Sequence, residues 1–184
     1  YPGANHKNTQ EAIGAALSQA NAGDWLLMQN ETNNQSYAAA TAKTLGLSVG
    51  YAAAPFDAQA VQAVMGSLDL LILNAVEAEQ LHQATGQSPA QLPVRDIIVT
   101  LGAEGCLWYG IEGQQQFEAI AVEPVDTTGA GDTFTGYVLA GLDRGMPMAQ
   151  AISLGIKAAG LMVTRLGTAD VIPDLKDLQD AQLI

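Results

Sequence analysis

The chain has 184 residues, within the size range of one domain, and 48% of them are hydrophobic, so it can bury a sizeable core. Its formal net charge of −12, with only seven Lys and Arg residues, argues against the broad basic surface that nucleic acid or an anionic membrane requires. A nucleotide ligand stays compatible with this charge, because backbone N–H groups bind phosphate without basic side chains.

Short apolar runs in the first part of the chain predict buried strands. They end in Asn, Gly or Pro signals, as strands of a parallel sheet often do, and they occupy residues 24–30, 47–53, 68–73 and 96–101. Segments with helical spacing lie between them, at residues 8–23, 35–46, 57–67 and 76–86. The first of these has Thr9 as its expected N-cap and Gly23 as its expected stop. The alternation predicts an α/β fold with a doubly wound, mainly parallel sheet.

The pattern changes in the second part of the chain. Residues 105–110 and 114–122 flank the turn "IEGQ" and predict a hairpin at a sheet edge. Long helices are predicted at residues 131–144 and 147–166, and a short one at residues 174–184. No repeat, low-complexity tract or linker divides the chain, so residues 1–184 are interpreted as a portion of one domain.

The stretch "DTTGAGD" (residues 126–132) is the strongest chemical signal. Its small residues Gly129, Ala130 and Gly131 leave room for a close ligand, and a helix starting at Gly131 or Asp132 would point unpaired N–H groups outward. Such a site suits a phosphoryl group that bears developing negative charge. Asp132 would then take a proton from an attacking hydroxyl. The alternative is an Asp132 that merely caps a helix after a Gly-rich turn, and spacing alone does not decide between them.

Two other phosphate-binding motifs are excluded here. A Walker A loop needs Lys after its last glycine, and the sequence contains no such loop. A dinucleotide fingerprint needs a third glycine at the position that Phe134 occupies.

The longer stretch "DTTGAGDTFTG" closely resembles the C-terminal signature of the ribokinase-like carbohydrate kinases, and most of all that of their ribokinases. The segments "PGAN", "LLMQNE", "LNAVEAE", "IIVTLGAEG" and "VTRLGTADVIP" extend the resemblance over nearly the whole chain. The resemblance implies transfer of the ATP γ-phosphoryl group to a primary hydroxyl of a small sugar, with ribose as the expected acceptor. Another acceptor of the family stays open: a nucleoside, a ketohexose phosphate or 2-keto-3-deoxygluconate. A noncatalytic nucleotide-binding module is the alternative from another class.

The resemblance also assigns roles on the nucleotide side. It implies a catalytic base at Asp132 and an anion hole at Gly129, Ala130 and Gly131. It implies that Asn74 and Glu77 handle phosphate and Mg²⁺, largely through water, although a solvated helix face would also explain Glu77. Residues expected to border ATP are Thr100, Gly102, Ala103, Gly105, Gly131 and Ile156, the last at a position where the family often carries His.

Further roles concern the sugar and a monovalent cation. Glu31 matches a carboxylate that binds sugar hydroxyls together with Asp132, although a solvated loop residue is its plainer reading. Ligands of a structural K⁺ ion are expected from Asp126, Thr128, Arg165 and Gly167. Val171 replaces an expected hydroxyl near this ion, which weakens the expectation of K⁺ dependence.

The sequence contains no counterpart of the N-terminal third of the family's usual chain. In the family, that part carries the first glycine signature, much of the sugar pocket and a small β lid. We therefore expect a piece of a longer, homo-oligomeric parent. By itself the chain is expected to bind nucleotide weakly, to be inactive as a kinase and to associate through an exposed sheet edge. The single cysteine, Cys106, the short apolar runs and the lack of a visible signal peptide predict a cytoplasmic protein with no membrane or nucleic-acid partner.

Overall fold

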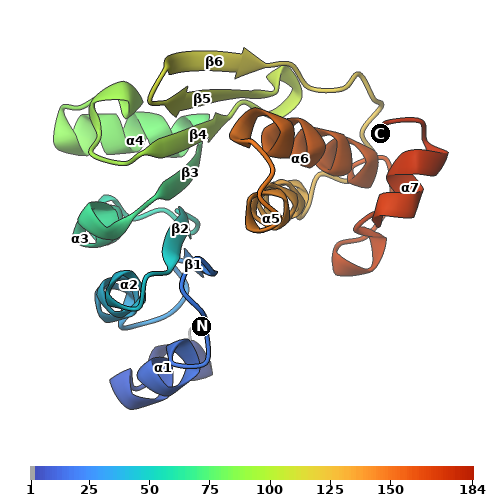
Figure 1. Ribbon diagram of the computed structural model, residues 1–184. Coiled ribbons are helices and arrows are strands. Elements are labelled where there is room, and N and C mark those ends of the chain that lie inside the picture. The colour runs from blue at the N-terminus through green and yellow to red at the C-terminus, as the bar shows by residue number, and fades with distance from the viewer. Residues whose placement is uncertain (1–2) are drawn as a thin grey trace. The chain divides into compact units, whose positions relative to one another are not determined.

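The structure, a computed structural model, describes residues 3–184, so the "PGAN" match begins at Pro2, outside the described residues. It contains a six-stranded sheet in the order β1-β2-β3-β4-β5-β6 (Figure 1). The strands are β1 (Trp25–Gln29), β2 (Ser48–Ala52), β3 (Leu70–Asn74), β4 (Asp96–Thr100), β5 (Cys106–Gly110) and β6 (Gly113–Phe117). The α-helices are α1 (Gln10–Leu17), α2 (Gln35–Thr44), α3 (Ala58–Val64), α4 (Ala75–Thr85), α5 (Ala130–Asp143), α6 (Met148–Met162) and α7 (Leu175–Asp180). Short 3₁₀ helices are η1 (Gly3–Lys7), η2 (Met65–Ser67), η3 (Pro89–Gln91), η4 (Gly102–Glu104) and η5 (Ala169–Val171).

The predicted α/β class with a mainly parallel sheet is confirmed. β1 pairs with β2 in parallel, with Trp25 beside Ser48, and β2 pairs with β3 in parallel, with Gly50 beside Leu70. The two-residue turn between β5 and β6 makes the predicted hairpin. Three of the four apolar runs form strands that are buried along most of their length, as β4 is from Asp96 to Val99, whereas in β1 only Met28 is buried.

The helix starts in the first part of the chain follow from local capping. The Thr9 hydroxyl accepts a hydrogen bond from the Ala12 N–H at 3.1 Å, as predicted. The same helix ends at Leu17, however, and does not reach Gly23. Tighter turns follow Leu17, with the Ala20 N–H donating to the Leu17 carbonyl at 3.1 Å, and the Asp24 carboxylate then accepts the Asn21 N–H at 2.7 Å in place of a helical hydrogen bond.

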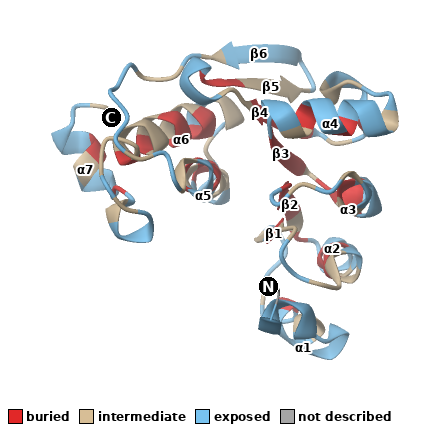
Figure 2. Cartoon of the chain, turned by 180° about the vertical axis from the view of Figure 1, so that it is seen from behind, coloured by how far each residue is buried: buried red, intermediate tan, exposed pale blue. Residues whose placement is uncertain are grey.

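The chain forms two compact units. The first runs to Val99 and includes residues from Trp108 to Gln115. In it, α2, α3 and α4 lie along one face of the strands (Figure 1), as expected when consecutive parallel strands are joined by crossovers of one hand. Buried residues concentrate on β2 and β3 and on the helix sides turned toward the sheet (Figure 2).

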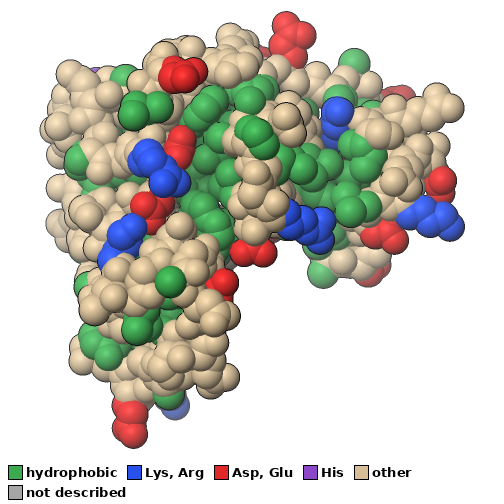
Figure 3. Space-filling model, in the orientation of Figure 1, with side chains coloured by type: hydrophobic (Ala, Val, Ile, Leu, Met, Phe, Trp, Pro, Cys, Tyr) green, Lys and Arg blue, Asp and Glu red, His purple; other side chains and the backbone are tan. Residues whose placement is uncertain are grey.

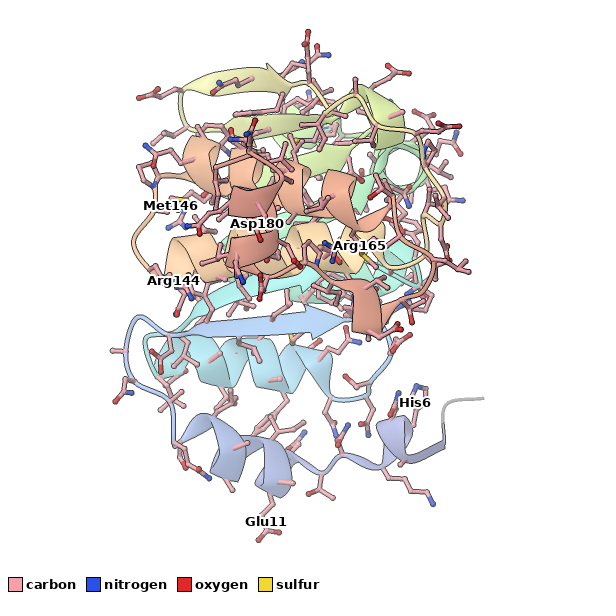
Figure 4. All side chains as sticks on the ribbon, turned by 90° about the vertical axis from the view of Figure 1, so that its right-hand side faces the viewer. His6, Glu11, Arg144, Met146, Arg165 and Asp180 are labelled. Carbon is pink, nitrogen blue, oxygen red and sulfur yellow. The ribbon has the colours of Figure 1, made fainter. Side chains whose placement is uncertain are left out.

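The second unit covers Thr100–Leu107 and Gln116–Ile184, and α5 and α6 are its centre. These two helices pack closely because Gly155 of α6 presents no side chain, and a Cβ there would lie 2.9 Å from Val138 Cγ2. Arg144 and Met146 lie on the connection between the two helices (Figure 4). That both units belong to one catalytic domain stays a prediction.

Three predicted elements in the later part of the chain are shorter than expected. The terminal helix was expected over residues 174–184, but α7 spans Leu175–Asp180, because Asp174 is its N-cap and Gln182 adopts a left-handed φ of +56°. α6 was expected to reach residue 166 but ends at Met162, because the next residues form tighter turns, with the Arg165 N–H donating to the Met162 carbonyl at 2.9 Å. The second hairpin strand ends at Phe117 and does not reach residue 122. The chain leaves the sheet there, and Ile120 packs against Gly160 of α6.

Charged side chains are spread over the surface. On the face that Figure 3 shows, the Lys and Arg side chains lie apart from one another. Among residues 3–184, none of the helices combines the length and the apolar character that a membrane crossing would need.

Candidate active site

The start of α5 carries the residues of the "GAGD" motif. The helix begins at Ala130, one or two residues earlier than predicted, and its N-cap is Gly129. Gly129 adopts a φ of +82°, a left-handed conformation that glycine takes at little cost. Asp132 is therefore the third residue of the helix, and the alternative that Asp132 caps the helix is wrong.

The N-cap residue Gly129 offers no side chain to cap the first turn of α5. The Ala130 N–H donates to the Thr127 carbonyl at 3.2 Å, and the Thr133 N–H donates to the Gly129 carbonyl at 2.9 Å. The Gly131 N–H lies between them, in the part of a helix that has no intrahelical acceptor. It also lies at the positive end of the helix dipole. This turn can therefore bind an anion through its backbone.

A pocket of about 290 Å³ adjoins this turn within the second unit. Its walls come from the η4 loop, the segment after β6, the start of α5 and one side of α6. The lining residues are Thr100, Gly102, Ala103, Gly105, Ala119, Ile120, Val122, Pro124, Thr127, Ala130, Gly131, Phe134, Ile156, Ala159, Gly160 and Val163. The structure thus brings together in one mostly apolar pocket all the residues of this unit that were expected to border ATP.

Two glycines shape the pocket through close packing. A Cβ on Gly105, whose φ is +92°, would lie 1.9 Å from the Phe117 carbonyl oxygen. A Cβ on Gly160 would lie 2.3 Å from Ile120 Cγ1, so Gly160 forms the notch in which Ile120 sits. Sequence reasoning missed Gly160 and Ile120.

A usable signal for part of this lining was present in the sequence. Ile156, Ala159, Gly160 and Val163 follow the spacing i, i+3, i+4, i+7, which places them on one side of a helix. Nothing comparable marks Ile120, because it lies in an irregular segment after β6.

The segments expected to hold a monovalent cation meet at Asp126. Its carboxylate accepts the Thr128 N–H at 2.9 Å. Hydrogen bonds from the Thr128 N–H, the Thr128 hydroxyl and the Gly167 N–H lower the pKa of Asp126 below its usual value of 3.8. A carboxylate that stays charged in this way fits a cation.

Arg165 can offer such a cation only its carbonyl oxygen. Its guanidinium donates to the Val171 carbonyl at 3.2 Å and to the Asp177 carboxylate at 3.1 Å. Figure 4 shows Arg165 near α7, to which Asp177 belongs. Within the described part of the chain, no three His, Cys, Asp or Glu side chains form a group that could hold a metal ion.

Three predicted residues belong to the first unit. Glu31 is exposed in the turn after β1. Asn74 and Glu77 form a reciprocal cap at the start of α4: Asn74 Oδ1 accepts the Glu77 N–H at 2.9 Å, and Glu77 Oε2 accepts the Asn74 N–H at 2.8 Å. Stabilisation of the helix start by this capping box is enough to explain why Asn74 and Glu77 occur at these positions. Their role toward phosphate and Mg²⁺ stays a prediction.

Comparison with known proteins gives consistent matches. A family model described as pfkB family carbohydrate kinase matches residues 1–175. A ribokinase from Haemophilus influenzae is 32% identical over 184 residues, which cover 93% of this chain and 60% of that protein. An aminoimidazole riboside kinase from Salmonella typhimurium is 37% identical over 111 residues, which cover 53% of this chain and 35% of that protein.

Solved structures agree. The crystal structure of a ribokinase from Thermotoga maritima superposes with a TM-score of 0.84 at 30% identity. The match covers 98% of this chain and 63% of that one. The chain therefore spans less than two thirds of the length of these relatives.

Proposed function

This chain belongs to the pfkB family of carbohydrate kinases, and we propose that it supplies the nucleotide-binding and phosphoryl-transfer residues of an ATP-dependent sugar kinase. One observation carries the proposal: an apolar pocket opens beside a helix start whose N-cap is a glycine, and a carboxylate follows in the same turn. The pocket suits the flat apolar faces of a nucleobase. The helix start suits its phosphates.

The reaction needs charge stabilisation and a base. As the γ-phosphoryl group transfers, negative charge grows on its oxygens, and the Gly131 N–H together with the helix dipole stabilises it. Asp132 takes the proton from the attacking sugar hydroxyl. Most of the catalytic effect in phosphoryl transfer comes from such positioning and electrostatics.

Bound Mg²⁺ supplies positive charge that neutralises the phosphates. Asn74 and Glu77 would hold it through water, because the capping box already uses one oxygen of each side chain. Asp126, with carbonyls of Thr128, Arg165 and Gly167, would hold K⁺. The hydrogen bonds that keep Asp126 charged support this assignment. Val171 brings no hydroxyl, so the ligand set contains fewer oxygens.

Ribose is the proposed acceptor, and Glu31 would bind its hydroxyls. The likeness to ribokinases over most of the chain favours ribose. A riboside is the second candidate, because the higher identity to an aminoimidazole riboside kinase extends over 53% of the chain. Both acceptors offer a ribose-type primary hydroxyl, so the chemistry at Asp132 is the same.

Calorimetric titration with a nonhydrolysable ATP analogue tests the pocket, and a coupled assay with ribose, aminoimidazole riboside and fructose 6-phosphate tests the acceptor. Ala159→Leu fills part of the pocket, whereas Ala140→Leu makes the same change at an exposed position of α5. Affinity is expected to fall only in the first variant. Absence of saturable binding by the wild-type chain, or equal affinity in both variants, would contradict the proposed site.

Activity of the 184-residue chain by itself is a separate question. We predict nucleotide binding without efficient turnover. Light scattering run beside the assay reports whether the chain associates with itself. Robust phosphorylation of ribose by a monomer of this chain would refute the prediction while supporting the proposed chemistry.

A further inference from the structure

The first turn of α5 must be held in place although its N-cap, Gly129, has no side chain. Asp132 lies in this turn, three residues after Gly129. Gly129 has the freest backbone of any residue type, so it cannot fix the turn by itself. Contacts from outside the turn can therefore help to set the direction of its first N–H groups.

Met162, the last residue of α6, makes such contacts. Its side chain is buried, with an exposed fraction of 1%. Its methyl group fills the space beside Gly129, where a Cβ would lie 2.9 Å from Met162 Cε. Its sulfur accepts a hydrogen bond from the hydroxyl of Thr133, the residue after Asp132, at 2.7 Å.

This hydrogen bond differs from those of three other helix hydroxyls. Thr44, Thr85 and Ser153 each donate to the carbonyl four residues earlier, at 2.8–3.0 Å. Thr133 donates across to α6. Because Thr133 is buried, its hydroxyl depends on a protein acceptor, and Met162 provides one.

Val163, the residue after Met162, contacts the segment that precedes this turn. The Val163 carbonyl accepts the Val125 N–H at 2.7 Å and the Asp126 N–H at 3.1 Å. Met162 and Val163 thus contact the "DTTGAGD" segment near both of its ends. Val163 does so through its backbone carbonyl, and Met162 through its side chain.

We propose that Met162 is a positioning residue, which acts through Gly129 and Thr133 to hold the first turn of α5, and with it the backbone of Asp132, in place for phosphoryl transfer. The proposal rests on the proposed function. Met162 does not line the pocket, so it acts on the turn and not on the nucleobase. Its loss should therefore lower kcat by a larger factor than it raises the KM for ATP.

Met162→Leu tests this, because leucine has a similar volume but offers no acceptor for Thr133. Met65→Leu is the matched control, since Met65 is also a buried methionine and lies in the first unit. A displacement of 1 Å in an active site can cost about a hundredfold, so we expect kcat to fall by about tenfold for partial misplacement. The control should keep its kcat, and both variants should keep their melting temperatures within a few degrees.

Thr133→Val removes the same hydrogen bond from the other side. If the two residues act through that bond, the double variant loses no more activity than one single variant, because their effects are not additive. Thr133→Ser keeps the hydroxyl and should restore kcat toward the wild-type value. A structural role alone would not produce this rescue.

Hydrogen exchange at residues 130–133 gives a readout that does not need catalysis. We expect faster exchange of these amides in Met162→Leu and unchanged exchange in Met65→Leu. If the wild-type chain transfers no phosphoryl group, the exchange result still decides whether Met162 holds the turn, and the proposed function fails separately. Met162→Leu with wild-type exchange and kcat, or additive effects with Thr133→Val, would overturn the proposal.

Discussion

The first turns of α4 and α5 differ in how they satisfy their backbone N–H groups. Both helices carry a carboxylate as their third residue, Glu77 in α4 and Asp132 in α5. In α4 the carboxylate bends back onto the N-cap N–H of Asn74, and the Asn74 side chain accepts the Glu77 N–H. In α5 the N-cap is Gly129, which has no side chain to do the same.

The difference indicates what each helix start is suited to bind. A capping box occupies the N–H groups that an anion would need, so α4 is stabilised by its own side chains. The start of α5 gives up that stabilisation and keeps the Gly131 N–H and the helix dipole for an external anion. Packing by Met162 and Val163 then replaces the missing cap as the support of the turn.

Asp132→Asn should give the largest effect, because it removes the base while keeping the size of the side chain. Loss of a general base typically lowers kcat by about a hundredfold to ten-thousandfold. Steady-state kinetics of the full-length kinase would measure it, with Asp143→Asn at the other end of α5 as control. Binding of the ATP analogue should be retained. A wild-type kcat in Asp132→Asn would contradict the role of Asp132 as the catalytic base.

Gly131→Val should come next, by placing a branched side chain where the phosphates pass. A Cβ on Gly131 meets no other atom within 4 Å, so the variant should fold, and the loss should appear in binding. Gly136→Val is the matched control, because Gly136 lies in the same helix and its Cβ also meets nothing. We expect affinity for the ATP analogue to fall by at least about tenfold, or 1.4 kcal/mol, in the first variant only. Equal affinities would contradict the comparison of the two helix starts.

The strands and most helix starts could be predicted because their causes are local. The apolar runs and the Thr9 cap were predicted and are present, and the segments expected to start at Asp57 and to end at Gly86 have these residues as N-cap and C-cap. The role of Gly129 as an N-cap was missed, because a left-handed glycine before a helix leaves no side-chain signature. The Ile120–Gly160 contact and the Met162–Thr133 bond were missed because each joins segments that lie well apart in the chain.

Asn74→Ala should have a moderate effect on stability. Removing an N-cap acceptor costs about 1 kcal/mol, which urea unfolding followed by circular dichroism can detect. Asn74→Ser keeps an acceptor and should lose only a few tenths of that amount. If Asn74→Ala leaves the free energy of unfolding unchanged, the capping box does not stabilise α4. That result would contradict the comparison between the starts of α4 and α5.

The smallest expected effect concerns pH and the turn that precedes α5. Because the pKa of Asp126 is lowered in the folded chain, its carboxylate stabilises the fold above the unfolded value near 3.8. That contribution is lost as the pH falls through the lower folded pKa. An NMR titration of the Asp126 carboxyl should give a midpoint below 3.8, and its hydrogen-bond partner Thr128 should shift with the same midpoint. A midpoint at or above 3.8 would mean that the Thr128 and Gly167 hydrogen bonds do not persist in solution.

The amide resonance of Gly131 tests the central claim most directly. The claim is that the uncapped start of α5 receives the phosphates of a nucleotide seated in the adjoining pocket. Titration of ¹⁵N-labelled chain with the ATP analogue should shift the Gly131 amide saturably, whereas adenosine, which lacks phosphates, should shift pocket residues such as Ala159 and leave Gly131 nearly unmoved. Saturable binding of the ATP analogue with an unmoved Gly131 amide would contradict the account.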